Sequence, residues 1–356
     1  MANEPVPNGT TNGHNGDTAR PKVLQLGLIE HAHDAWAEIG KLATIIKPTA
    51  TDRASFLAEA RSGAFDGCIV AYRTFESFDI TGKVDEEMLS ALPSSLRFIC
   101  HNGAGYDQVV VPACTKRGIR VSNTPTAVDD ATADIGIFLM LGALRNLAAS
   151  MASLRAGDWR GKDGSLPALG HDPQGKTLGI LGMGGIGRNM AKKAAVFGMK
   201  VRYFNRTRLE PEVERECGAE YVDLETLLRE SDVLSLNLPL NEHTRHIISK
   251  PQFDQMKDGI VLVNTARGAV MDEAALVDAL ASGKVYSCGL DVFEDEPKIH
   301  PGLLANPNVF LVPHMGTWTV ETQTKMEAWT ISNVRRALTE GKLRSIVPEQ
   351  AKISFA

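Results

Sequence analysis

Short apolar runs alternate with amphipathic stretches over most of the chain. In its first third, residues 22–28, 66–71 and 96–100 are apolar runs of strand length, and turn-forming residues end the last two. Residues 53–61 and 85–92, which lie between these runs, have the apolar spacing of helices. This alternation is typical of an α/β layer built on a mainly parallel sheet.

A second alternating series begins at residue 177, and helical segments separate most of its strands. The strands predicted for this series are 177–181, 200–204, 220–222, 232–238, 259–263, 286–290 and 309–312. A last helical stretch, 320–340, is long enough to return to the first series. We therefore predict an α/β fold of two Rossmann-like, doubly wound parallel-sheet domains, a discontinuous one at 21–124 plus 318–356 and an inserted one at 125–317.

One long apolar stretch lies between the two series. Residues 127–147 are apolar on nearly every face and contain small residues throughout, and a helix of this kind is buried. Such a helix spans about 30 Å, so it is either a bridge across a domain or subunit interface or a plain core helix. Residues 156–175, with five glycines and two prolines, are expected to form a loop.

Composition excludes several classes of protein. The net charge of −5 and the lack of a basic stripe argue against a nucleic-acid partner, and no apolar run approaches the ~20 residues of a membrane span. The five cysteines are scattered, which fits reduced core thiols rather than disulfides or metal ligands. Residues 1–20, rich in Asn, Gly, Thr and Pro, are expected to be a disordered tail, and the cytoplasm is the expected location.

A glycine-rich turn gives the first chemical signal. The sequence Gly182-Met183-Gly184-Gly185-Ile186-Gly187 directly follows the strand predicted at 177–181 and opens a helical stretch at 186–197. In this context the first glycine permits a tight turn, the second lets backbone approach a pyrophosphate, and the third lets the helix pack on the strand. The helix N-terminus adds unpaired N–H groups and partial positive charge. Domain 125–317 is therefore predicted to bind a dinucleotide, the alternative being a turn without a ligand.

The end of the next strand indicates which dinucleotide binds. An NAD-specific site has an acid here, which binds the ribose 2′-hydroxyl and repels a 2′-phosphate. This chain instead has Asn205-Arg206-Thr207-Arg208, which begins 18 residues beyond Gly187. Two guanidinium groups without an acid suit a phosphate dianion, so NADP(H) is the predicted cofactor.

Three polar residues follow strands of the second series, where this architecture places its chemistry. Arg267 comes just after the strand at 259–263, Glu296 lies in an acidic loop after 286–290, and His314 follows the final strand. Each of them alone is more often a solvated or structural residue. Their joint occurrence in this order makes them candidates for catalysis, whereas the other histidines have no such context.

With these motifs the chain resembles the D-isomer-specific 2-hydroxyacid dehydrogenases, and among them the NADP-using glyoxylate/hydroxypyruvate reductase group. The resemblance covers about residues 60–335 and includes Asn102-Gly103-Ala104-Gly105-Tyr106-Asp107 and Asn123-Thr124-Pro125. It implies that Arg267, Glu296 and His314 are catalytic. It also implies that the domain at 21–124 plus 318–356 binds substrate, that the active site lies between the domains, and that the protein is a homodimer.

The chemistry of 2-oxo acid reduction agrees with this assignment. Arg267 can bind the substrate carboxylate and polarise the carbonyl group. His314, as imidazolium, can give the proton while the nicotinamide gives the hydride, and the ordinary pKa of a histidine, about 6.5, suits proton transfer in both directions. Glu296 is expected to orient the ring and favour its charged form. Because a cell's NADP pool is mostly reduced, reduction is the expected direction.

The predicted sites include several further residues. The residues predicted to bind the cofactor are Gly182, Gly184, Gly185, Ile186, Gly187, Asn205, Arg206, Thr207, Pro239, Thr265, Ala266 and Asp291. Among these, the resemblance implies that Asp291 contacts the nicotinamide carboxamide. Pro239 is interpreted either as packing near the adenosine ribose and diphosphate or as a strand breaker.

For the substrate, the resemblance implies that N–H groups of Gly103, Ala104 and Gly105 hold the carboxylate, the alternative being a simple turn. Arg73 is interpreted either as a second positive group near the cleft or as a surface residue. Trp318 stands where the family commonly has a small residue, and it is expected to line the pocket and alter substrate preference.

The substrate therefore stays open among glyoxylate, hydroxypyruvate, a longer sugar-derived 2-oxo acid such as a ketogulonate, and an aromatic 2-oxo acid. Two other functions fit the same scaffold. One is a formate or phosphonate dehydrogenase, which usually uses NAD and is disfavoured by the segment 205–208. The other is a non-catalytic, dinucleotide-sensing corepressor, which is disfavoured by the lack of long regulatory extensions.

Overall fold

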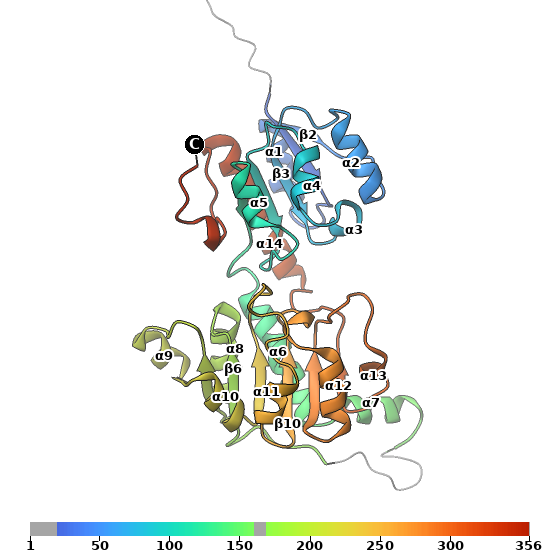
Figure 1. Ribbon diagram of the computed structural model, residues 1–356, viewed down its shortest axis with the longest axis vertical. Helices are drawn as coiled ribbons and strands as arrows, with labels where there is room; N and C mark the ends of the chain where they lie inside the picture. Colours follow the sequence, from blue (N-terminus) through green and yellow to red (C-terminus); the bar gives the residue numbers. More distant parts are fainter. Residues whose placement is uncertain (1–19, 160–168, 356) are drawn as a thin grey trace, which may run out of the picture.

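The first unit of the molecule is a five-stranded parallel sheet covered by helices. The computed structural model describes residues 20–159 and 169–355, which form two units arranged end to end (Figure 1). The strands of the first sheet are β1 (Lys22–Leu26), β2 (Thr44–Ile46), β3 (Cys68–Thr74), β4 (Phe98–Asn102) and β5 (Arg120–Ser122), in the order β2-β1-β3-β4-β5. Its helices are α1 (His33–Leu42), α2 (Arg53–Arg61), α3 (Phe78–Thr81), α4 (Glu86–Ala91) and α5 (Val111–Lys116).

The second unit is a seven-stranded parallel sheet. Its strands are β6 (Thr177–Leu181), β7 (Lys200–Phe204), β8 (Ala219–Tyr221), β9 (Val233–Leu236), β10 (Ile260–Asn264), β11 (Val285–Leu290) and β12 (Val309–Leu311). Their order, β12-β11-β10-β9-β6-β7-β8, reverses direction between β6 and β9, which is the topological switch point where such sheets bind ligands. Its main helices are α8 (Gly185–Val196), α9 (Pro211–Cys217), α10 (Leu224–Glu230), α11 (Lys250–Gln255), α12 (Glu273–Ala281) and α13 (Pro301–Leu304). The predicted fold class, two doubly wound parallel-sheet units, is confirmed.

Two strands were not predicted. β2 and β5 are only three residues long and lie at the two edges of the first sheet. Three residues are too few to establish an apolar period. The predicted tail at residues 1–20 lies outside the described residues apart from Arg20, as do residues 160–168 of the predicted loop.

The apolar stretch at 127–147 is part of two helices rather than one. α6 (Asp129–Leu144) packs against α8, β10 and β11, so it is a core helix of the second unit. Asn146 adopts a left-handed conformation, with φ 51°, and α7 (Leu147–Arg155) leaves at an angle of 76°. In the described ranges no single helix is long and apolar enough to cross a bilayer; α6 and α7 reach that length and apolarity only as this bent pair.

The last long helix, α14 (Val320–Glu340), packs on the first sheet (Figure 1). Its apolar face shares a core with residues of β1 and β3. Glu327, which is buried on this helix, accepts hydrogen bonds from the backbone N–H groups of Glu30, His31 and Ala32 at 2.8–2.9 Å. The carboxylate thus satisfies unpaired donors at the start of α1, which has no side-chain cap of its own.

Buried apolar residues also connect the two units. Ala127, Val128 and Met326 form a small cluster against which Ala104 and Ile186 pack. This cluster brings the loop after β4, the start of α14 and the glycine turn of the second unit to one junction. The five cysteines are all buried and unpaired, as expected for core thiols.

Candidate active site

The glycine turn has the geometry that its sequence predicts. Gly182 has φ +100°, and a Cβ there would lie 2.6 Å from the Asn237 carbonyl oxygen. A Cβ at Gly187 would lie 2.5 Å from the Gly182 carbonyl oxygen, so the third glycine sits where α8 touches the strand end. In contrast, no atom lies within 4 Å of a Cβ built at Gly184. The turn is therefore tightly packed at its first and third glycines and open at its second.

The features around this turn fit a dinucleotide. α8 starts at Gly185, so its first N–H groups have no partner within the helix and point past the open side of Gly184. Asn205, at the end of β7, accepts a hydrogen bond from the Met183 N–H (2.7 Å) and fixes the turn. The buried hydroxyl of Thr265, after β10, has no hydrogen-bond partner in the structure, which leaves it for a bound group.

The segment after β7 offers one free guanidinium group rather than two. Arg208 binds Glu214 through two hydrogen bonds of 2.8 Å, and the Tyr203 hydroxyl donates to the same carboxylate (2.6 Å). Arg208 and Tyr203 hold the pKa of Glu214 down at about 2. Arg206 is exposed and makes no hydrogen bond or ion pair within residues 20–159 and 169–355, and Thr207 is likewise exposed. The expectation that both arginines face the cofactor is therefore wrong for Arg208, because its guanidinium group is bound to Glu214 of α9.

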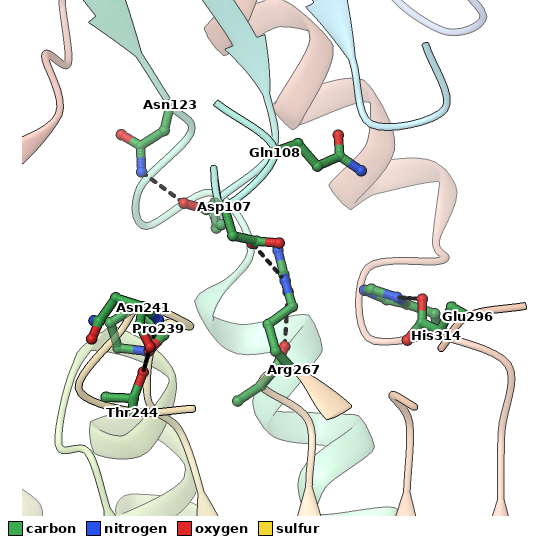
Figure 2. Close-up of polar contacts among 12 residues, drawn as sticks. Asp107, Gln108, Asn123, Pro239, Asn241, Thr244, Arg267, Glu296 and His314 are labelled. Carbon is green, nitrogen blue, oxygen red and sulfur yellow. Dashed lines mark hydrogen bonds and ion pairs between the residues drawn. The ribbon is translucent and has the colours of Figure 1, made fainter. Parts of the chain in front are cut away.

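Pro239 and Ala266 lie in loops after neighbouring strands. The Pro239 carbonyl accepts a hydrogen bond from the Thr244 hydroxyl (2.6 Å), which closes the loop after β9 (Figure 2). The Ala266 N–H donates to the Asn264 side chain (3.0 Å) at the end of β10. Both loops thus follow strands beside the switch point of the second sheet.

Arg267 and His314 both lie next to one aromatic ring, which belongs to the other unit (Figure 2 shows the two residues). Phe75, which follows β3, has its ring centroid 5.9 Å from the Arg267 guanidinium carbon and 5.6 Å from the centroid of the His314 ring. Arg267 Nε also donates to Asp107 Oδ1 at 2.9 Å. The structure therefore brings the arginine and the histidine, predicted from separate strands, to the junction of the two units.

Glu296 holds the His314 ring. Glu296 Oε2 lies 2.9 Å from His314 Nδ1, and Glu296 Oε1 accepts the Phe293 N–H at 2.9 Å. Burial alone raises the pKa of Glu296, but hydrogen bonds from the ring and from the backbone, with the nearby charges of His314 and Arg267, bring its pKa below the usual value. The carboxylate is therefore charged at neutral pH and fixes Nδ1, which leaves Nε2 as the nitrogen able to exchange a proton with a ligand.

Asp291 supports the histidine from behind. It is buried at the end of β11, its carboxylate accepts the N–H groups of Met315 and Gly316, and its carbonyl accepts the N–H of His314 (2.8 Å). His314 itself is left-handed, with φ 54°. Burial raises the pKa of Asp291 to about 6, against the effect of its hydrogen bonds. Asp291 thus binds the loop that carries His314, and the sequence did not predict this contact.

The loop 103–105 is bound to the first unit through its carbonyl groups. Each of its carbonyl groups accepts a hydrogen bond from that unit: Gly103 from the Thr124 N–H (2.9 Å), Ala104 from Asn123 Nδ2 (2.8 Å) and Gly105 from His101 Nε2 (2.9 Å). Within the described part of the chain, the three N–H groups have no hydrogen-bond partner. The Arg267 guanidinium packs on the α-carbon of Gly105, where a Cβ would overlap it. Free donors and a guanidinium together suit a carboxylate.

Two candidates lie elsewhere than expected. Arg73 is fully buried in the first unit, so the surface alternative is wrong, and its side chain has no exposed atom with which to touch a substrate. Trp318 is 65% exposed, and its backbone N–H donates to the Met315 carbonyl (3.0 Å). Its indole ring makes no ring contact with His314. The ring beside His314 belongs to Phe75, which sequence reasoning missed together with Asp107.

The open side of Gly184 generates a prediction. Gly184→Ala is expected to leave the thermal unfolding midpoint unchanged while weakening dinucleotide binding by about tenfold or more, because the added methyl group enters the space that a pyrophosphate needs. Gly187→Ala is the matched control. Its methyl group meets backbone and should lower stability by about 1–3 kcal/mol. Calorimetric binding and thermal unfolding of both variants check this, and unchanged binding by Gly184→Ala would contradict the location of the site.

Comparisons with known proteins agree with this geometry. The family model "D-isomer specific 2-hydroxyacid dehydrogenase, NAD binding domain" matches residues 137–316. The chain is 53% identical to 4-methyl-2-oxopentanoate reductase A of Aspergillus oryzae over 94% of this chain and 99% of that protein. The crystal structure of a glyoxylate reductase from Paecilomyes thermophila has a TM-score of 0.90 and 52% identity, covering 93% of this chain and 99% of that one.

A more distant structure carries a bound nucleotide. It is the NADPH-dependent glyoxylate/hydroxypyruvate reductase of Sinorhizobium meliloti in complex with NADP and malonate, with a TM-score of 0.80 and 30% identity over 93% of this chain and 98% of that chain. The resemblance stated from the motifs is thus confirmed. The chain belongs to the family of D-isomer specific 2-hydroxyacid dehydrogenases, which is a family of oxidoreductases.

Proposed function

We propose that this protein reduces a 2-oxo acid to the corresponding D-2-hydroxy acid with NADPH. The observation that carries the proposal is the placement of Arg267 and the His314–Glu296 pair beside the same ring, that of Phe75, next to the free N–H groups of the loop 103–105. This arrangement offers a carboxylate site and a proton donor side by side. Both are needed to reduce a 2-oxo acid.

Different residues of the chain bind the substrate and transfer the proton. The N–H groups of 103–105 and the guanidinium of Arg267 bind the substrate carboxylate, and Arg267 polarises the carbonyl group. His314 Nε2 donates the proton to the carbonyl oxygen, and Glu296 stabilises the imidazolium form and fixes the orientation of the ring. The bound dinucleotide supplies the hydride. In the oxidative direction His314 accepts the same proton.

NADP(H) is the proposed cofactor because of Arg206. The end of β7 carries no acid to bind a ribose 2′-hydroxyl, and Arg206 is exposed and unpaired in the described structure. Arg208 does not contribute, since Glu214 occupies it. The NADP complex of the Sinorhizobium meliloti relative is consistent with this choice.

An apolar 2-oxo acid is the proposed substrate class. Phe75 presents an aromatic ring next to both Arg267 and His314. Burying an apolar side chain against this ring contributes roughly 25 cal/mol per Å², which glyoxylate, having no side chain, cannot use. The Aspergillus oryzae relative is named for 4-methyl-2-oxopentanoate. We therefore propose that a branched 2-oxo acid of this size is preferred to glyoxylate.

A homodimer is the proposed assembly. Phe138 on α6 and Leu147, Met151 and Leu154 on α7 are exposed apolar side chains, and α7 has no buried residue at all. Two adjacent helices with an uncovered apolar face suit a second copy of the chain. A solution mass equal to one chain would contradict this assembly. The cytoplasmic location stays a prediction.

The catalytic proposal is tested by following NADPH oxidation with a panel of 2-oxo acids that includes 4-methyl-2-oxopentanoate and glyoxylate. His314→Ala is expected to lower kcat by about 10²–10⁴-fold. Glu296→Gln should lower kcat less and move the alkaline limb of the activity profile to lower pH, because the imidazolium loses its carboxylate partner. Protonation of Glu296 itself should reduce wild-type activity only below pH 4.5, since the pKa of Glu296 is lowered from that value.

Asp295→Asn, which removes an exposed charge next to Glu296, is the control and should leave the profile unchanged. An unshifted profile for Glu296→Gln would refute the pairing role. Tight NADPH binding without turnover of any 2-oxo acid would favour the dinucleotide-sensing alternative.

Cofactor choice is tested with a second pair of variants. Arg206→Ala is expected to raise the KM for NADPH by about tenfold or more and to change the KM for NADH little, because only NADPH carries the 2′-phosphate. Arg208→Ala removes an arginine two positions away that is bound to Glu214, and it should affect both coenzymes equally. Equal effects of Arg206→Ala on the two KM values would refute the NADP assignment.

A further inference from the structure

Arg73 is a buried cation without an acidic partner. It lies in β3, is 0% exposed and is the largest fully buried side chain of the described residues. Its Nη1 lies 3.1 Å from His101 Nδ1, its Nη2 donates to Gln108 Oε1 at 2.9 Å, and its Nε has no partner. Both partners are uncharged. A buried charge is costly unless another charge compensates it, so this arrangement calls for an explanation.

The contact with Arg73 determines the tautomer of His101. A guanidinium group can only donate hydrogen bonds, so His101 Nδ1 must accept one and carries no proton. The ring proton is then on Nε2, which donates to the Gly105 carbonyl at 2.9 Å. Burial, together with the charges of Arg73 and Arg267, lowers the pKa of His101 well below its usual value, so the ring stays neutral. These two hydrogen bonds form a relay, in which Arg73 donates to His101 and His101 donates to the Gly105 carbonyl.

This relay ends on the loop that is proposed to bind the substrate carboxylate. By donating to the Gly105 carbonyl, His101 fixes the peptide group that joins Gly105 to Tyr106 and so anchors the end of the loop 103–105. Gly103 also packs against the ring, because a Cβ there would lie 2.6 Å from His101 Nε2. Gln108, the other partner of Arg73, follows Asp107, the partner of Arg267. Arg73 thus supports both ends of the segment 103–108.

Arg73 has no carboxylate partner of its own among the described residues around this segment. Arg267 is paired with Asp107 and His314 with Glu296, at 2.9 Å in each case. The hydrogen bonds of Arg73 go to neutral groups, and Glu76, which also acts on its charge, is exposed and makes no ion pair with it in the described structure. The guanidinium therefore places an unpaired positive charge behind the loop 103–105, and such a charge favours an anionic substrate.

We infer that Arg73 is a positioning residue for the substrate carboxylate: it binds Nδ1 of His101, whose Nε2–H holds the loop 103–105, and it places a positive charge without a carboxylate partner behind that loop. This inference rests on the proposed function, because it assigns a way to bind the acid group of the substrate. It gives Arg73 no direct contact with substrate or cofactor.

The charge and the geometry can be separated by two substitutions. Gln108→Glu keeps an oxygen on Arg73 Nη2 but gives the guanidinium a carboxylate partner, so the charge of Arg73 is neutralised while the hydrogen bond remains. Arg73→Met removes both the charge and the partner of His101 Nδ1. Arg117→Met removes a half-buried arginine elsewhere in the first unit, which makes a long hydrogen bond of 3.4 Å to the Leu92 carbonyl, and serves as the control.

The readouts are the KM for the 2-oxo acid, the KM for NADPH, kcat, the thermal midpoint and the dissociation constant of oxamate, a carboxylate analogue, measured on the NADPH complex. Gln108→Glu is expected to raise the KM for the acid and the oxamate dissociation constant by about tenfold, with kcat, the NADPH KM and the thermal midpoint little changed. Arg73→Met should raise both constants further, and Arg117→Met should change neither. Unchanged constants in Gln108→Glu, or losses shared equally with NADPH binding and kcat, would overturn the inference.

The His101 tautomer gives a test that does not depend on turnover. In ¹⁵N-histidine-labelled NADPH complex, with His101 assigned from the spectrum of His101→Gln, the ring is expected to keep the Nε2–H signature from pH 5 to 9. Arg73→Met should shift the Nδ1 resonance, which loses its hydrogen-bond donor, while the proton stays on Nε2 opposite the Gly105 carbonyl. A wild-type His101 that titrates in this range, or an Nδ1 resonance that Arg73→Met leaves unmoved, would refute the relay. If the wild-type protein turns over no 2-oxo acid while the signature behaves as expected, the proposed function fails and the relay stands.

Discussion

Parallel strands place all of their carboxyl ends at one edge of a sheet, and this constraint builds the whole site. In the first unit Phe75 follows β3, and the loop 103–108 follows β4. In the second unit Arg267 and His314 follow β10 and β12. The two edges meet at the junction, where Arg267 reaches Asp107 and His314 reaches Phe75. Residues far apart in the sequence therefore face one another without any element having to depart from regular structure.

The parts that sequence predicted correctly are those that local geometry determines. The turn at 182–187 needs glycine at its first and third positions because the backbone of residues 237 and 182 lies too close for a side chain. The bounds of α14 agree with the predicted 320–340 because Thr319 caps its start and a left-handed Gly341 ends it, and both are local signals. The order of the motifs along the chain was likewise enough to select the family.

The parts that sequence missed depend on packing between distant segments. A charged residue at the end of a strand is usually solvated, so nothing near Arg73 in the sequence indicates that His101 and Gln108 enclose it. Nothing in the sequence around Phe75 indicates its role, because its contacts with Arg267 and His314 form only where the second unit meets the first. The pairing of Arg208 with Glu214 depends on how α9 leaves β7, which removes one of two arginines that looked equivalent in the sequence.

In the proposed reaction Arg267 and His314 act on the same ligand from one face of the nicotinamide ring. A crystal structure of the protein with NADPH and oxamate is the most direct test. We expect the diphosphate over Gly184, with Arg267 and His314 Nε2 both within about 3.5 Å of the oxamate. A dinucleotide bound away from the turn at 182–187, or the two side chains in separate cavities, would contradict it.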